Sequence, residues 1–233
     1  MHLPDDLFPL EYRAEEKFIC NEGDMLSLQN RLSAVMKSDG NGEKYLVRSL
    51  YFDDLRQSAL CDTLSGTDDR VKYRIRTYNG DKSVIKLEAK EKKHGFTRKQ
   101  SCEISFETAS KLISCELVPI SGDIPDVLNR FLIETRLAMM RPCIVVEYER
   151  QAFVNEAGNV RITFDRAVSS ANADRFWDSD IEGHSPICEP LNITEIKYDG
   201  VLPSHIRQLC ENGHMRKTSF SKYAICAAGT VDL

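Results

Sequence analysis

The segment RVKYRIRTY, residues 70–78, carries a basic residue at every second position and apolar residues between them. Because a β-strand sends successive side chains to opposite faces, the four cations would share one face of a strand. The segment KLEAK, residues 86–90, repeats the alternation. Like charges this close repel one another unless an extended anion lies against them, so the two segments indicate phosphate chemistry. The cations concerned are Arg70, Lys72, Arg74, Arg76, Lys86 and Lys90.

Periodicity and turn signals predict about eight strands with helices between them. The Asn79-Gly80 pair is a strong hairpin signal, and hairpins exclude a parallel doubly wound sheet. We therefore predict an α+β fold: an eight-stranded antiparallel β-barrel with helices packed around the outside, in a single domain over residues 1–233. Strands are expected at 12–20, 45–53, 70–78, 83–92, 97–106, 143–154, 159–165 and 191–198. Helices are expected at 22–37, 55–64, within 107–138 (interrupted by Pro119 and Pro125), 203–211 and 219–227, with a turn at Gly40–Gly42 and a loop at 169–187.

The charge of the chain is unevenly distributed. Residues 70–99 contain eleven Lys or Arg and three acidic residues, so this segment is +8 and the rest of a chain of net charge -5 is -13. A general nucleic-acid binder is more often basic overall, and the basic strands lack clustered exposed aromatic residues that stack on bases. The pattern predicts a focused anion site and no nucleic-acid partner.

The eight cysteines form no CxxC pair and no zinc-type cluster with histidine. The N-terminal residues lack the features of a secretory leader, and no apolar run approaches the roughly 20 residues of a membrane span. We expect reduced thiols in a cytoplasmic protein, with any link to a membrane made through a partner.

Closure of the strands into a barrel would place alternate residues in its interior, and nearly every strand has one charged face. The alternative is that these are solvated outer faces with Lys–Glu pairs across strands, which is the commoner origin of a charge run. Several strands share the basic excess, however, and helices between the strands must cover the apolar faces from outside. The charged faces are therefore expected to point inward, with these further members: Arg13, Glu15, Lys17, Glu88, Lys99, Glu103, Arg161, Thr163, Asp165, Glu195 and Lys197.

A tunnel lined with cations suits a triphosphate or polyphosphate chain, and its few acids would hold a divalent cation. Oxygen ligands suit Mg²⁺ or Mn²⁺. Glu195 is the first candidate metal ligand, and Glu88 and Glu103 are weaker ones because each could instead pair with a neighbouring cation. No Walker loop, GxGxxG, GxSxG or HExxH motif points to another chemistry.

An ordered set of short motifs then resembles the polyphosphate polymerase domain of the vacuolar transporter chaperone family, within the triphosphate tunnel metalloenzymes. The motifs are RxExK (13–17), SLYFDD (49–54), KYRIRTY (72–78), KLEAK (86–90), YERQAF (148–153), VRITFD (160–165), TEIKY (194–198) and FSKY (220–223). The resemblance implies a tunnel in which the terminal phosphate of ATP is added to a polyphosphate chain, with Mn²⁺ or Mg²⁺ as cofactor. The related cyclase and thiamine triphosphatase branch carries ExExK in the first strand, so Arg13 favours the polymerase branch.

The resemblance also implies roles for individual residues. Glu195 would hold the metal, and Ser221 with Lys222 would lie near one tunnel mouth. Arg150 follows Tyr148 in simple alternation, so a bulge is expected if Arg150 is to join the other charges. Arg70, Lys72, Lys86, Lys99 and Lys197 follow from the charge pattern and are expected to bind substrate. Phosphate contacts are implied for Lys17, Arg74, Arg76, Lys90, Arg150, Arg161 and Lys222.

Three other functions stay open at this point. The same tunnel could hydrolyse tripolyphosphate or a nucleoside triphosphate, it could bind polyphosphate without turnover, or the fold could be a nucleic-acid-binding barrel. The chain resembles the stand-alone domain that bacteria encode, so coupling to the inner face of a membrane would require a separate membrane protein. ATP, pyrophosphate and polyphosphate are the expected small-molecule partners.

Overall fold

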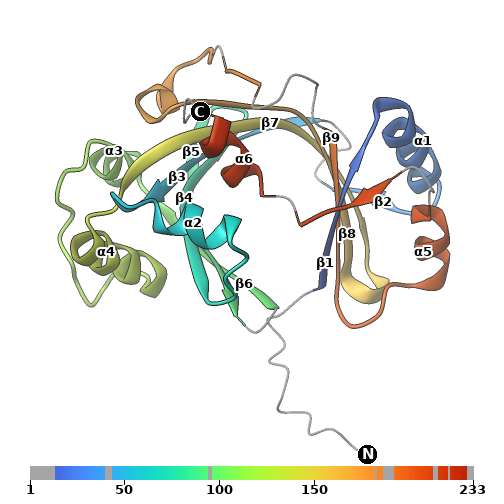
Figure 1. Cartoon of the computed structure of the whole chain (residues 1–233), viewed down its shortest axis with the longest axis horizontal. Coiled ribbons are helices and arrows are strands. Elements are labelled where there is room, and N and C mark those ends of the chain that lie inside the picture. The colour runs from blue at the N-terminus through green and yellow to red at the C-terminus, as the bar shows by residue number, and fades with distance from the viewer. Residues whose placement is uncertain are drawn as a thin grey trace, which may run out of the picture.

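The computed structural model describes residues 14–39, 44–93, 96–181, 183–185, 192–211, 215–219 and 221–229 (Figure 1). Its strands form one antiparallel sheet in the order β10-β1-β9-β8-β7-β3-β4-β5-β6, with β2 paired to β7. The eight longer strands are β1 (Ala14–Cys20), β3 (Tyr45–Asp53), β4 (Arg70–Tyr78), β5 (Asp81–Lys93), β6 (Phe96–Ile104), β7 (Arg141–Asn155), β8 (Val160–Asn172) and β9 (Asn192–Tyr198). Two strands of two residues, β2 (Lys37–Ser38) and β10 (Arg216–Lys217), are added to the predicted eight.

The helices that the structure describes lie between the strands or after them along the chain. They are α1 (Glu22–Ser33), α2 (Ser58–Leu64), α3 (Phe106–Ile113), α4 (Asp126–Ala138), α5 (Ser204–Cys210) and α6 (Lys222–Gly229), with 3₁₀ turns η2 (Ala157–Asn159) and η3 (Ala173–Trp177). The predicted α+β fold class is confirmed, as is the division of the 107–138 region into two helices.

Local chemistry explains one turn and one helix start in this fold. Asn79 and Gly80 have φ angles of 52° and 69°, the left-handed pair that a tight hairpin between β4 and β5 requires. Asn21 begins α1, because its Oδ1 accepts a hydrogen bond from the Asp24 amide at 2.8 Å.

The sheet is strongly curved, but its hydrogen bonding does not close into a ring. No ladder joins β1 to β6 among the described residues, although the two strands approach each other. An ion pair joins the two sides of the curved sheet here: Lys90 Nζ on β5 lies 2.9 Å from Glu15 Oε2 on β1. Figure 1 shows the sheet arched over α2 and α6.

The apolar face of the central strands packs outward against α3 and α4. Tyr73, Ile75 and Leu87 are fully buried there with Phe131 of α4. The Tyr73 and Phe131 ring centroids lie 5.0 Å apart. Because helices take up the apolar face, the cations that alternate with Tyr73 and Ile75 point into the curve of the sheet, as predicted.

Two short helices, α2 and α6, pack on the inner side of the sheet. Tyr223 of α6 stacks on Tyr51 of β3, with centroids 4.8 Å apart, and its hydroxyl donates to buried Asp53 at 2.5 Å. Ala224 and Cys226 are buried in the same cluster. This apolar contact fixes the start of α6, where Ser221 and Lys222 lie, against the interior of the sheet.

Several predicted boundaries are wrong. The first helix ends at Ser33, because Lys37 and Ser38 pair with β7. The predicted loop at 169–187 begins later than expected, since β8 continues to Asn172 and η3 follows it. A register shift between Glu147 and Glu149 of β7, with Ala167 of β8 at a φ of 49°, restores pairing beyond the predicted end of β8.

Seven cysteines lie in the described part of the chain and none of them is paired in a disulfide there: Cys20, Cys61, Cys102, Cys115, Cys143, Cys210 and Cys226. No helix in the described ranges has the length and apolar character needed to cross a bilayer. Arg13, Phe220 and the Gly40–Gly42 turn lie outside the described residues.

Candidate functional site

A cavity of about 700 Å³ lies on the inner face of the sheet, and all eight longer strands contribute to its wall. Most of the residues predicted to contact phosphate or metal line it. These are Lys17, Lys72, Arg74, Arg76, Lys90, Lys99, Arg150, Arg161, Glu195, Lys197, Ser221 and Lys222.

Three lysines form a row across neighbouring strands at one end of the cavity. Lys72 of β4 pairs with Lys90 of β5, which pairs with Lys99 of β6. Burial, reinforced by the surrounding cations, lowers the pKa of both Lys72 and Lys90 to about 7. Lys72 and Lys90 are therefore expected to gain protons when an anion binds beside them. At the same end, the Lys72 ammonium donates to Ser221 Oγ at 3.3 Å.

The next row along β4 is anchored by a buried carboxylate. Arg74 Nη2 and Lys99 Nζ each lie 2.6 Å from a Glu88 oxygen, and Arg76 Nη1 lies 3.6 Å from Oε2. Burial alone would raise the pKa of Glu88, but these cations outweigh it and hold the pKa well below its usual value. Glu88 is fully buried beneath the cavity wall, so it orients cations and does not face the cavity.

Tyrosine hydroxyls and a serine complete the coordination of the arginines. Arg74 Nη1 donates to Tyr51 at 2.9 Å, and Arg76 donates to Ser49 Oγ at 3.0 Å and to Tyr148 at 3.2 Å. These contacts fix both guanidinium planes before any ligand arrives.

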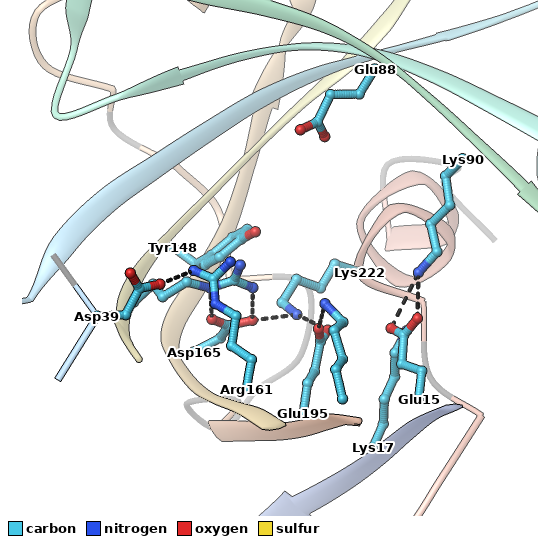
Figure 2. Close-up of polar contacts among 12 residues, drawn as sticks. Glu15, Lys17, Asp39, Glu88, Lys90, Tyr148, Arg161, Asp165, Glu195 and Lys222 are labelled. Carbon is cyan, nitrogen blue, oxygen red and sulfur yellow. Dashed lines mark hydrogen bonds and ion pairs between the residues drawn. The ribbon is translucent and has the colours of Figure 1, made fainter. Parts of the chain in front are cut away.

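On the opposite wall, cations and carboxylates alternate in a continuous chain (Figure 2). Arg150 donates two hydrogen bonds, of 2.6 and 2.7 Å, to the two carboxylate oxygens of buried Asp165. Lys222 lies 2.6 Å from Asp165 and 2.9 Å from Glu195, and Lys197 lies 3.1 Å from the second Glu195 oxygen.

The pKa values of Lys222 and Glu195 on this wall favour their charged forms. Burial would lower the pKa of Lys222, but Asp165 and Glu195 raise it above its ordinary value. Burial would raise the pKa of Glu195, but Lys222, Lys197 and Lys17 hold it well below its usual range. The wall therefore presents fixed charges in a poorly solvated space, where they act strongly on a ligand.

The two ends of the cavity lie on opposite sides of this row of alternating charges (Figure 2). Glu15, Lys17 and Lys90 stand at one end, and Glu15 is held ionised by its lysine neighbours, although burial opposes this. At the other end Arg161 Nη2 lies 2.6 Å from Asp39 Oδ2 and donates to Tyr45 at 3.2 Å.

Four predicted residues do not line the cavity. Arg70 turns back and donates to the carbonyls of Asp62 and Thr67. Lys86 faces Glu103 across β5 and β6, and Glu103 is exposed at the edge strand, so the structure does not bring these two residues to the cavity. Glu88 pairs with Arg74, Arg76 and Lys99. Pairing with neighbouring cations was the alternative that the sequence left open to a role as metal ligand.

The expected bulge at Arg150 is also wrong. Simple alternation does place Arg150 with Tyr148, but Tyr148 itself faces the cavity, and the Arg150 guanidinium lies 5.0 Å from its ring centroid. The extra residue of the β7–β8 pair lies on β8 near Ala167.

The sequence prediction missed the cavity tyrosines and Asp39. Tyr45, Tyr51 and Tyr148 bind arginines by their hydroxyls, and Asp39 lines the cavity. Glu15, which was expected to point inward, also lines it.

The carboxylates fit one mode of metal binding. Glu15 and Glu195 line the cavity, and within the described ranges no group of three Asp, Glu, His or Cys side chains is arranged to hold a metal ion. Mg²⁺ is commonly held by one or two carboxylates and completed by water and substrate phosphates. The donors fit a cation shared between Glu195 and a phosphate chain, and they do not fit an all-protein cage.

Comparison with known proteins supplies the family. The sequence matches the VTC domain over residues 12–231. The chain belongs to the VTC domain family. Among curated proteins, no relative matches the sequence.

Solved structures show the fold that this VTC domain shares with others. One similar structure is a candidate adenylyl cyclase from Hippeastrum, described as having a dominant triphosphatase activity, with 15% identity, a TM-score of 0.58, and coverage of 94% of this chain and 97% of that chain. Another is a candidate adenylate cyclase from Bacillus halodurans, with 15% identity, a TM-score of 0.54, and coverage of 86% and 87%. This likeness shows that the chain shares its fold with these two proteins.

Proposed function

We propose that this VTC domain is a metal-dependent phosphotransferase that moves the γ-phosphate of ATP to a growing inorganic polyphosphate chain. The observation that carries the proposal is the excess of basic side chains that line one cavity. The cavity wall holds ten Lys or Arg side chains and three carboxylates, Glu15, Asp39 and Glu195. Self-repulsion on this scale is relieved by an extended polyanion, and membership of the VTC family supports a phosphate chain as that polyanion.

The proposed roles follow from position. Arg74 and Arg76 are held by Glu88 and by tyrosine and serine hydroxyls, so they offer rigid forks for phosphate oxygens. Lys222 and Arg150 stand on the opposite wall, paired to Asp165. A triphosphate between these walls would have its oxygens neutralised from both sides.

The reaction requires little covalent chemistry from the protein. A terminal oxygen of pyrophosphate or polyphosphate attacks the γ-phosphorus, the bond from that phosphorus to the β–γ bridging oxygen breaks, and ADP leaves with the electron pair. The side chains position the two phosphates in line and stabilise the charge that develops on the transferred group.

Glu195 is the proposed holder of Mg²⁺ or Mn²⁺. A cation held by Glu195 would supply positive charge that withdraws electron density from the phosphate groups. Both Glu195 oxygens lie within 3.1 Å of lysine ammonium groups, those of Lys197 and Lys222, which would contribute positive charge beside the same carboxylate.

Hydrolysis in the same cavity is the second candidate. The description of the Hippeastrum protein includes a dominant triphosphatase activity, and its fold is similar. The two reactions differ only in the acceptor of the phosphoryl group, which is water in hydrolysis and a terminal phosphate oxygen in polymerisation. A polyphosphate-binding module without turnover is the third candidate, and for it the cavity needs no metal.

One experiment separates these functions. The purified protein is incubated with ATP, Mg²⁺ or Mn²⁺ and a pyrophosphate primer, and the products are resolved by size. Long phosphate polymers with stoichiometric ADP support the polymerase. ADP with free phosphate alone supports the hydrolase, and binding without ADP formation supports the binding module.

The resemblance also motivates a proposal about location: a cytoplasmic domain that meets the inner face of a membrane through a separate membrane protein. Cell fractionation tests it, with recovery in the membrane fraction that depends on a partner as the expected result.

A further inference from the structure

Two side chains at the start of α6 reach opposite walls of the cavity. Lys222 Nζ lies 2.6 Å from Asp165 on β8 and 2.9 Å from Glu195 on β9 (Figure 2). Ser221, immediately before α6, accepts a hydrogen bond from Lys72 of β4 at 3.3 Å. The position of α6 therefore decides how both side chains meet a ligand in the cavity.

A buried carboxylate at the end of β3 holds α6 from outside the cavity. Asp53 Oδ2 accepts hydrogen bonds from the Tyr223 hydroxyl at 2.5 Å and from the Leu60 amide at 3.0 Å. Asp53 Oδ1 accepts from the amides of Asp54 and Ala59, at 2.9 and 3.0 Å. Asp53 is 4% exposed, and neither Asp53 nor Tyr223 lines the cavity. One carboxylate thus joins the start of α2 to the first turn of α6.

The ring and the hydroxyl of Tyr223 make separate contacts. The ring stacks on Tyr51, with centroids 4.8 Å apart. Burial raises the pKa of Tyr223 well above its ordinary value, and Cys143 and Asp53 add to the effect, so the hydroxyl keeps its proton and donates. A hydrogen bond fixes direction as well as distance. Because Asp53 is itself held by α2, this bond sets the position of Lys222, the residue before Tyr223.

We propose that the Asp53–Tyr223 hydrogen bond positions Lys222 for contact with a phosphate chain, so that Tyr223 is a positioning residue that touches no ligand itself. The inference rests on the proposed function in taking a phosphate chain as the ligand. The alternative is that Asp53 and Tyr223 only stabilise the fold, since Asp53 also caps α2. The two roles differ in one respect: a positioning residue acts through Lys222, and a purely stabilising residue does not.

A double-mutant cycle measures this dependence. Titration calorimetry gives the affinity for tripolyphosphate of four forms of the protein: wild type, Tyr223→Phe, Lys222→Met and the double variant. EDTA is present, so that no metal-dependent turnover occurs during the titration. Lys222→Met is expected to weaken binding about tenfold, because a charge-assisted hydrogen bond is lost. Tyr223→Phe is expected to weaken binding about fivefold in the wild-type background and less than about twofold in the Lys222→Met background.

A matched substitution controls for the loss of a tyrosine hydroxyl as such. Tyr198 is half-buried at the end of β9 and does not line the cavity, so Tyr198→Phe should keep wild-type affinity. Thermal unfolding without ligand checks that each variant folds. Tyr223→Phe is expected to fold, because it keeps the ring and leaves Asp53 its amide donors.

The outcomes separate this inference from the function beneath it. An equal loss from Tyr223→Phe in both backgrounds would overturn the inference, because Tyr223 would then act on the fold and not through Lys222. No loss of affinity in Tyr223→Phe would overturn it as well. Absence of tripolyphosphate binding by the wild-type protein would refute the proposed function and the inference with it. Because affinity is measured, a hydrolase and a polymerase give the same test.

Discussion

Replacement of Glu88 by glutamine removes a buried charge without changing the shape of the side chain. Glu88 is fully buried, with Arg74 and Lys99 nitrogens at 2.6 Å and an Arg76 nitrogen at 3.6 Å. Loss of one partner from a buried ion pair costs about 3–5 kcal/mol. The arginines retain tyrosine and serine hydroxyl partners, and Lys99 is half exposed, so we expect the lower figure, about 3 kcal/mol.

The loss is measured as the free energy of unfolding in denaturant, without phosphate, and as a fall in Tm of about 6–12 °C. Glu103→Gln is the matched control: the same change on the neighbouring strand at an exposed position, expected within about 0.5 kcal/mol of wild type. The pKa of Glu88 is far below its usual value, so its stabilisation is present above pH about 4.5 and is lost only as the pH falls through the lowered pKa. Equal stability of Glu88→Gln and wild type at pH 7, or an equal loss in the control, would refute the electrostatic role of Glu88.

Three further predictions concern the cavity. Arg76→Ala should lower turnover by about 10²–10³, with far-UV circular dichroism unchanged, because it removes a fixed donor to the transferred phosphate; near-normal turnover would contradict this. Glu195→Gln should raise the metal concentration needed for half-maximal turnover, and an unchanged metal titration would exclude Glu195 as the ligand. Tripolyphosphate affinity should fall as the pH rises from 7 to 9, because Lys72 and Lys90 have pKa values of about 7 and lose charge above that pH. Calorimetry in buffers of different ionisation enthalpy should show proton uptake on binding, and a Lys72→Met variant should show a flatter pH profile.

The same two lysines affect stability without ligand. Their pKa values are lower in the folded protein than in the unfolded chain, where lysine titrates near 10.4. Between these values the unfolded state binds more protons, so the free energy of unfolding contributed by these lysines rises with pH. Thermal unfolding at pH 7 and 8.5 checks the sign, and a contribution that falls over this range would contradict the lowered pKa values.

Strand alternation in the sequence was enough to predict the faces of β4. It separates Tyr73 from Arg74 and Arg76, and the structure buries the first against α4 and turns the others into the cavity. The antiparallel order followed from turn chemistry, since Asn79-Gly80 forces a hairpin.

Other features depend on contacts that no local pattern contains. Alternation alone assigns Tyr148 to an apolar face, whereas Arg76 across the sheet recruits its hydroxyl into the cavity wall. Arg70 shares the face of Arg74, but the neighbouring loop offers carbonyls that draw it away. The extension of β8 depends on the register shift near Ala167, which becomes visible only when β7 and β8 are paired.

The most direct test of the account is a crystal structure of the protein with tripolyphosphate and Mg²⁺. The account predicts phosphorus density inside the sheet, between Arg74 and Arg76 on one wall and Arg150 and Lys222 on the other, with the cation against Glu195. Phosphate bound on the outer surface, with these four cations unoccupied, would contradict the claim that the cavity is the site of phosphoryl transfer.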